Sequence, residues 1–194
     1  SIIDVGIDLT IFGQIVLAGM LLIGGLGLMA ITTFLQGFVL SGTELKCRLD
    51  RGKTLDEFGV GGVGRTFRGI ALTAAILIFI GALILYLFGF TDITNTGQRL
   101  WAAIFHSISA YNNAGFALWS ESMQDYRNNW VVNIVMLMLI ILGGLGWRVT
   151  SDIWSNRTTL KIRNLSLHTR LVIRTSWILI AIGALGLLLT ESLM

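Results

Sequence analysis

Residues 100–117 carry polar side chains and one glycine in a stretch that is otherwise apolar. The polar members of the uncharged run from residue 100 to residue 120 are His106, Ser107, Ser109, Asn112, Asn113 and Ser120. We expect a helix over 96–109, followed by an extended strand over 111–116. The C-terminal end of a helix dipole is negative, and backbone carbonyl groups can replace the hydration shell of a cation. The pattern predicts a cation site of main-chain oxygens, where Gly115 permits backbone angles that other residues avoid.

The composition around this segment excludes several classes of protein. Apolar residues make up 54% of the 194 residues, charged residues make up 13%, and the mean hydropathy is +0.77. Soluble domains usually have about 25% charged residues. An ordinary soluble enzyme, a disordered acidic chain and a nucleic-acid-binding domain are therefore excluded. The single cysteine, Cys47, also excludes a disulfide framework.

Four apolar stretches predict membrane-spanning helices, because a helix needs about 20 mostly apolar residues to cross a bilayer. They lie within residues 9–43, 69–91, 128–147 and 175–190. The last reaches full length if Arg170 and Arg174 snorkel to the interface. The polar run 100–120 is costly to expose to lipid, and its apolar part is too short to cross.

The distribution of basic residues decides how the polar run is placed. All but two of the 14 Lys and Arg residues lie in the connectors 41–68 and 148–174. These connectors would face opposite sides of the membrane if 100–120 crossed it. The positive-inside rule favours the same side for both, so we expect a hairpin that enters from outside and returns. The basic pI then results from the membrane topology, which gathers Lys and Arg in these connectors. We expect lipid headgroups as their partners and no nucleic acid.

An internal repeat supports this organisation. A Gly-Gly-Leu-Gly motif occurs twice, so that glycines stand at Gly24, Gly25, Gly27, Gly143, Gly144 and Gly146. These glycines are either hinges or sites of close helix packing, and we favour packing against a short pore helix. We expect an all-α membrane protein built from repeated units of outer helix, pore helix, filter and inner helix.

The predicted boundaries follow from this order. Residues 1–40 form the inner helix of a first unit, and 41–67 and 155–168 form cytoplasmic connectors. Residues 68–154 form a complete second unit, with an outer helix at 68–90, a pore helix at 96–109, a filter at 110–116 and an inner helix at 129–151. Residues 169–194 form the outer helix of a third unit. The chain is thus expected to be a fragment of a longer polypeptide.

The run from Ser109 to Phe116, Ser-Ala-Tyr-Asn-Asn-Ala-Gly-Phe, resembles the pore-loop signature of the Trk/Ktr/HKT potassium transporters, most of all their bacterial Ktr branch. The Gly-Gly-Leu-Gly motifs resemble that family as well, and the similarity covers essentially the whole chain. It implies potassium translocation through a central pore of four fused units. The selectivity filter would comprise Asn112, Asn113, Ala114, Gly115 and Phe116, braced by Tyr111 and Ser109.

The resemblance has further implications. It implies a multi-pass protein of the bacterial cytoplasmic membrane and no covalently bound cofactor. Potassium is the transported ion, and sodium is expected as a coupling or activating ion. The full-length subunit is expected to form a homodimer and to dock a cytoplasmic nucleotide-binding regulatory ring.

Alternatives from other classes remain at this point. One is a cation channel of four separate subunits, and another is a non-conducting membrane anchor or interaction protein. The predicted spans contain no Asp, Glu or His, which argues against an enzyme. His106 lacks a second ligand at metal-binding spacing, so we interpret it as a packed pore-helix histidine. The glycine-rich run 59–64 lacks the context of a dinucleotide site and is interpreted as a flexible turn.

Overall fold

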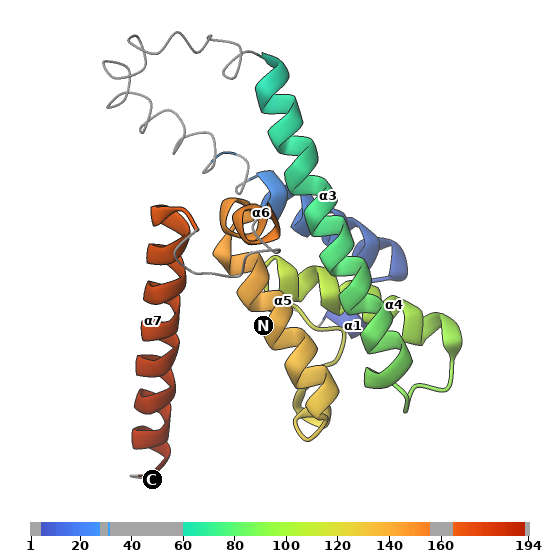
Figure 1. Ribbon diagram of the computed structural model, residues 1–194. Helices are drawn as coiled ribbons and strands as arrows, with labels where there is room; N and C mark the ends of the chain where they lie inside the picture. Colours follow the sequence, from blue (N-terminus) through green and yellow to red (C-terminus); the bar gives the residue numbers. More distant parts are fainter. Residues whose placement is uncertain (1–4, 28–30, 32–59, 156–164, 193–194) are drawn as a thin grey trace, which may run out of the picture. The chain divides into compact units, whose positions relative to one another are not determined.

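The computed structural model describes residues 5–27, 31, 60–155 and 165–192, and all regular structure within them is helical. This confirms the all-α prediction for the described part of the chain. The residues divide into two compact units, Ser1–Gly144 and Leu145–Met194. The main helices are α1 (Val5–Asp8), the helix Ile11–Gly27, α3 (Val60–Ile84), α4 (Thr96–Tyr111), α5 (Trp130–Leu145), α6 (Trp147–Ser155) and α7 (Leu167–Ser192) (Figure 1).

Helix α3 is longer than the sequence pattern predicted. It begins at Val60 rather than at residue 68, so residues 60–64 of the glycine-rich run lie in the helix and the turn predicted there is wrong. Glycine costs about 1 kcal/mol in a helix interior but does not remove a hydrogen-bond donor as proline does. No proline separates these glycines from the next apolar run, and the helix therefore continues through them.

The end of α3 widens into a π-helical turn, η3 (Leu85–Gly89). Its closing hydrogen bond runs from the Phe90 amide to the Leu85 carbonyl at 2.9 Å. This turn places Phe90 in the core, where its side chain is fully buried. Residues 90–95 then connect the π turn to α4.

Helices α3 and α5 of the first unit position α4. Helices α3 and α4 pack against each other, and α4 lies crosswise to α3 (Figure 1). Gly81 of α3 faces Leu139 of α5, where a Cβ atom would approach the leucine side chain to 2.7 Å. Phe105 and Ile108 of α4 lie in the hydrophobic cluster that also includes Leu139. The C-terminal half of α4 is therefore enclosed by protein.

The predicted inner helix 129–151 is two helices. Helix α5 ends at Leu145, and Gly146 has a φ of +82°, in the left-handed region. A left-handed glycine is a common helix terminator because it has no Cβ to clash. At about 1.5 Å per residue, the 16 residues of α5 extend about 24 Å.

Within the second unit, Asp152 of α6 anchors the start of α7. Its Oδ2 accepts hydrogen bonds from the Ser166 amide at 2.9 Å and from the Thr169 hydroxyl at 2.6 Å. The Ser166 hydroxyl accepts from the Thr169 amide at 3.2 Å, which is the N-cap arrangement. The anchor explains why α7 begins at Leu167, close to the predicted residue 169.

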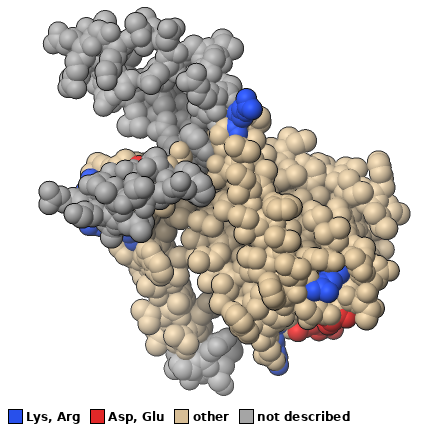
Figure 2. Space-filling view, turned by 45° about the vertical axis from the view of Figure 1, so that its right-hand side comes forward, with Lys and Arg blue, Asp and Glu red and all other residues tan. Residues whose placement is uncertain are grey.

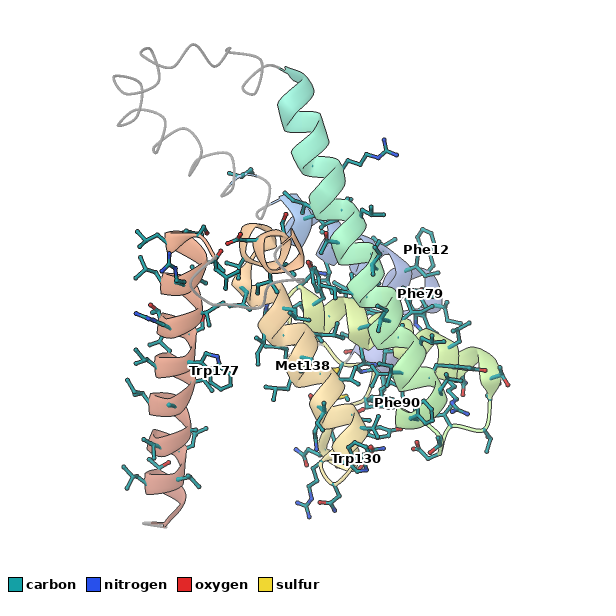
Figure 3. All side chains as sticks on the ribbon, viewed as in Figure 1. Phe12, Phe79, Phe90, Trp130, Met138 and Trp177 are labelled. Carbon is teal, nitrogen blue, oxygen red and sulfur yellow. The ribbon has the colours of Figure 1, made fainter. Side chains whose placement is uncertain are left out.

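Two described helices are long and apolar enough to cross a membrane, namely Phe67–Gly89 and Leu167–Thr190. The apolar helices Ile11–Gly27 and Trp130–Leu145 are shorter, and the rest of the predicted span near residue 34 lies outside the described residues. Large apolar side chains such as Phe79, Met138 and Trp177 are exposed on their helices (Figure 3). Charged side chains occupy little of the described surface in view (Figure 2). Such a surface suits a lipid environment.

Candidate functional site

Helix α4 is held at its N-terminal end by polar contacts. The Asn95 side chain accepts from the Gly97 amide at 3.0 Å and from the Gln98 amide at 3.3 Å, which caps the helix. The Arg99 guanidinium donates to the Leu87 carbonyl at 3.2 Å and lies 4.9 Å from the centre of the Tyr86 ring. These contacts join the start of α4 to the end of α3.

A buried glutamine joins α4 to the N-terminal helix. Trp101 Nε1 donates to Gln14 Oε1 at 2.7 Å, and Gln14 Nε2 donates to the carbonyls of Val5 and Leu9. Every polar atom of the Gln14 side chain is thus paired, as a buried amide requires. Sequence reasoning missed Gln14, because a lone glutamine in an apolar helix forms no motif.

The backbone after α4 forms a tight turn and not the predicted extended strand. The helix continues to Tyr111, and the Asn112 amide still donates to the Ile108 carbonyl at 3.1 Å. Asn113 and Gly115 then adopt φ values of +53° and +72°. Asparagine and glycine are the residues that tolerate this region best. The prediction of a strand over 111–116 is wrong because these left-handed residues turn the chain.

The chain then runs back along α4. The Ala114 amide donates to the Ser109 carbonyl at 2.9 Å, and the Ser109 hydroxyl donates to the Phe116 carbonyl at 2.7 Å. Further along, the Leu118 amide donates to His106 Nε2 at 3.3 Å. The segment 114–118 is therefore antiparallel to the last turns of α4, and the two together form a hairpin.

Five consecutive carbonyl groups at the tip of this hairpin, from Tyr111 to Gly115, accept no hydrogen bond from any described residue. The first of them, on Tyr111, lies against Gly143. The other four follow it in the turn and belong to Asn112, Asn113, Ala114 and Gly115. Asn113 and Gly115 are also exposed. Unpaired carbonyl groups beside the negative end of a buried helix can coordinate a cation. The Phe116 carbonyl differs from these five, because the Ser109 hydroxyl already uses one of its lone pairs.

The side chains near the tip have separate roles. Asn112 Nδ2 donates to the Ile108 carbonyl at 2.8 Å, so this side chain braces the turn. Tyr111 is buried in the apolar cluster beside Phe105 and Ile108. The side-chain amide of Asn113 lies near Gly144. The structure thus brings together all seven residues that we named as filter or filter support.

Only some of the repeated glycines approach the hairpin. A Cβ atom at Gly143 would overlap the carbonyl group of Tyr111, and one at Gly25 would overlap the side-chain amide of Asn112. Gly144 is in ordinary contact range of Asn113. Gly24, Gly27 and Gly146 have no atom within 4 Å of such a Cβ, apart from their own helix backbone and chain neighbours. Close packing therefore concerns one glycine of each motif.

Hollows flank the returning segment. A cavity of about 260 Å³ is lined by Ser109, Ala110, Asn113, Gly115, Phe116, Ala117, Ser122, Met123, Met136 and Ile140. Its walls are mostly apolar, apart from the hairpin backbone and a few polar side chains. In the part of the chain that the structure describes, no three His, Cys, Asp or Glu residues lie together as a metal site would need. The hairpin is thus the chemically distinctive site among the described residues.

An aromatic and polar cluster lies at the other end of the hairpin. Phe90 contacts the rings of His106, Trp119 and Tyr126 at centroid distances of 5.6, 5.3 and 4.9 Å. The Tyr126 hydroxyl donates to Asp92 Oδ2 at 2.7 Å. Burial, together with the neighbouring Asp92 carboxylate, raises the pKa of Tyr126 well above its usual range. Tyr126 therefore stays protonated and keeps this hydrogen bond at neutral pH.

Comparison with known proteins places this hairpin in a family. All 194 residues match the model of a family described as TrkH, cation transport protein. The chain is 34% identical over 191 residues to Ktr system potassium uptake protein B of Bacillus subtilis, and 31% identical over 195 residues to that of Vibrio alginolyticus. It is 28% identical over 179 residues to the potassium/sodium uptake protein NtpJ of Enterococcus hirae.

The extent of these matches differs between the chain and its relatives. The two Ktr proteins match 98% of this chain but only 42% of their own length, and NtpJ matches 92% of this chain and 39% of its own length. The chain therefore spans about two fifths of the relatives that it matches. The full-length family match confirms the resemblance seen in the pore-loop signature. The chain belongs to the TrkH family of cation transport proteins and is an integral membrane protein.

Proposed function

We propose that this chain contributes one selectivity filter to a potassium uptake pathway, with the carbonyls of residues 112–115 as the ion ligands. The observation that carries the proposal is the run of carbonyl groups at the C-terminal end of α4 that find no donor among the described residues, of which those of residues 112–115 lie in the turn. Backbone at membrane depth leaves carbonyls unpaired only where they line a polar path. The potassium uptake proteins among the relatives support potassium as the cargo.

The supporting residues have distinct parts in this proposal. Gly115, at φ +72°, orients the carbonyl groups on either side of it. Ser109 tethers the Phe116 carbonyl, so Phe116 marks the outer end of the ligand set. Asn112 braces the turn through the Ile108 carbonyl, and Tyr111 anchors it in the core.

A complete pathway requires hairpins in addition to this one, since one hairpin cannot surround an ion. We propose that four repeated units enclose the pore. The second unit is contained in this chain, and the other filters lie elsewhere in the protein. The fact that the chain spans about 42% of the length of the Ktr relatives supports this proposal.

Coupling and partners are part of the same proposal. We propose that sodium couples to or activates uptake, for which the relative named as a potassium/sodium uptake protein is the support. We also propose that the full-length subunit is a homodimer with a cytoplasmic nucleotide-binding ring. Co-purification of the full-length subunit from its native host, followed by mass measurement of the complex, tests both the homodimer and the binding of the ring. Recovery of a monomer without a soluble subunit contradicts them.

The experiment on the filter is Gly115→Ser in the full-length transporter, assayed for potassium and sodium uptake in a potassium-starved host. No atom lies within 4 Å of a Cβ at this position, so the serine meets no clash and acts through backbone strain alone. We expect discrimination of potassium over sodium to fall about tenfold, because strain of about 1–2 kcal/mol displaces the carbonyls. Insertion into the membrane is expected to be unchanged.

Gly19→Ser is the matched control for this experiment. Gly19 lies in the helix Ile11–Gly27, and it too has no atom within 4 Å of a Cβ. We expect its uptake and selectivity to equal those of the parent. A Gly115→Ser protein that is as selective as the parent would rule out the proposed filter and favour a non-conducting role for this hairpin.

A further inference from the structure

A second side chain of α4, His106, holds the returning segment of the hairpin beside the Ser109 tether. His106 is fully buried, and its neighbours on both sides of the ring are aromatic. Sequence reasoning treated this histidine only as packing. Its hydrogen bonds indicate a more specific role, and the inference of this role rests on the filter proposed above.

The two ring nitrogens of His106 have opposite partners. Nδ1 lies 2.7 Å from the Ala102 carbonyl, which only accepts hydrogen bonds, so Nδ1 must carry a proton. Nε2 lies 3.3 Å from the Leu118 amide, which only donates, so Nε2 must present a lone pair. The partners therefore select the neutral imidazole with its proton on Nδ1.

The ring is also held in orientation by stacking. His106 and Trp119 lie parallel, with centroids 4.4 Å apart and an angle of 14° between their planes. Phe90 packs edge-on against both rings. The imidazole plane is thus set by the residue directly after Leu118, and rotation of the ring would break the stack and both hydrogen bonds together.

Leu118 is fixed from its other side as well. A Cβ atom at Gly6 of α1 would overlap the Leu118 carbonyl, so α1 lies directly against this backbone. The Leu118 amide points to His106 on α4. In addition to the Ala114 amide bond, the returning segment therefore has two side-chain tethers to α4, at Phe116 through Ser109 and at Leu118 through His106. The four carbonyls of residues 112–115 precede both side-chain tethers.

We propose that His106, as the neutral Nδ1–H tautomer, is a positioning residue of the filter. Its Nε2 accepts a hydrogen bond from the Leu118 amide and thereby sets the path of the chain after the carbonyls of residues 112–115. Ser109 supplies a donor and His106 supplies an acceptor, so the segment is held in one register along α4. Loss of the acceptor leaves a buried amide unpaired and lets the segment shift.

The first test determines which ring nitrogen of His106 carries the proton. The full-length transporter is labelled with ¹⁵N-histidine, and the signals that disappear in His106→Gln are assigned to His106. We expect a protonated Nδ1 and an unprotonated, hydrogen-bonded Nε2 at neutral pH. A protonated Nε2, in either the neutral or the charged ring, overturns the proposal whether or not the protein transports potassium.

The second test separates hydrogen bonding from packing. His106→Phe keeps an aromatic ring against Trp119 and Phe90 but removes both ring nitrogens. We expect potassium-over-sodium discrimination to fall about fivefold with membrane insertion retained, and we expect His106→Gln to recover part of it through its side-chain carbonyl. His168→Phe, at an exposed position of α7, is the matched control. Parental selectivity in a correctly inserted His106→Phe protein overturns the positioning role.

If His106→Phe does not insert, the proposal is tested with His106→Gln alone. The expected result is then a selectivity between that of the parent and that of Gly115→Ser, with the tautomer signals absent. Parental selectivity in a correctly inserted His106→Gln protein overturns the positioning role. A failure of the filter itself is recognised separately, because it appears in Gly115→Ser.

Discussion

The two Gly-Gly-Leu-Gly motifs have the same sequence but contact the hairpin differently. In the helix Ile11–Gly27, the second glycine, Gly25, faces the side chain of Asn112. In α5 the first glycine, Gly143, faces the backbone carbonyl of Tyr111. The motifs therefore meet neighbouring residues of the same turn, one through a movable side chain and the other through rigid backbone.

The motifs also differ in the backbone conformation of their last glycine. The first remains helical through Gly27, whereas the second ends its helix at Leu145 because Gly146 is left-handed. The difference teaches that a repeated motif does not imply equivalent roles for each position. The copies share a glycine that lets a helix approach the end of α4 closely.

The largest effect is expected at Gly143. In Gly143→Ala the new methyl group overlaps the Tyr111 carbonyl, and that carbonyl cannot move without displacing the filter. We expect a loss of about 2–3 kcal/mol of stability, measured by thermal unfolding of the full-length protein in detergent, and loss of uptake. Gly144→Ala is the control, since its methyl group has only an ordinary contact at 3.7 Å. Equal behaviour of the two variants would show that the close approach at Gly143 is unimportant.

A smaller effect is expected at Gly25. Gly25→Ala forces the Asn112 side chain to rotate and to give up its 2.8 Å hydrogen bond to the Ile108 carbonyl. We expect a loss of about 1 kcal/mol, seen in the same unfolding experiment. Gly24→Ala has open space around it and serves as the control.

A double variant sharpens this prediction. In an Asn112→Ala background the obstructing amide is gone, so Gly25→Ala should cost less than it does in the parent protein. Additive losses in Gly25→Ala/Asn112→Ala would mean that these two residues do not interact. The proposed difference between the two motifs, a side-chain contact at Gly25 and a backbone contact at Gly143, would then be wrong.

Effects no larger than this, and different in sign between the two motifs, are expected at the last glycines. Gly146→Ala meets no atom but must adopt a φ of +82°, which costs about 1 kcal/mol. Gly27→Ala lies in ordinary helix with open space and should be neutral or stabilising by up to about 1 kcal/mol. Thermal unfolding of both variants measures the difference. A destabilised Gly27→Ala beside an unaffected Gly146→Ala would contradict the assignment of a helical backbone to Gly27 and a left-handed one to Gly146.

Much of the fold could be predicted because it depends on local composition. The all-α class was confirmed for the described residues, and α4 covers the predicted pore helix with two residues more. The start of α3 and the break at Gly146 could not be predicted, since glycine is compatible with helix, turn and terminator alike. The left-handed backbone angles of Asn113 and Gly115 could not be predicted either, because they depend on the packing of this segment along α4.

Sequence alone determined the membrane character of this protein, its family and the segment that carries the candidate filter. These properties depend on hydropathy, on the placement of basic residues and on a contiguous motif, all of which can be read along the chain. Only the tertiary structure decided which glycine of each motif touches the hairpin, which carbonyls find no donor among the described residues, and that His106 accepts a hydrogen bond from the Leu118 amide. Those details depend on the partners of individual atoms, and residues far apart in the sequence, such as Gly25 and Asn112, become partners only when helices pack.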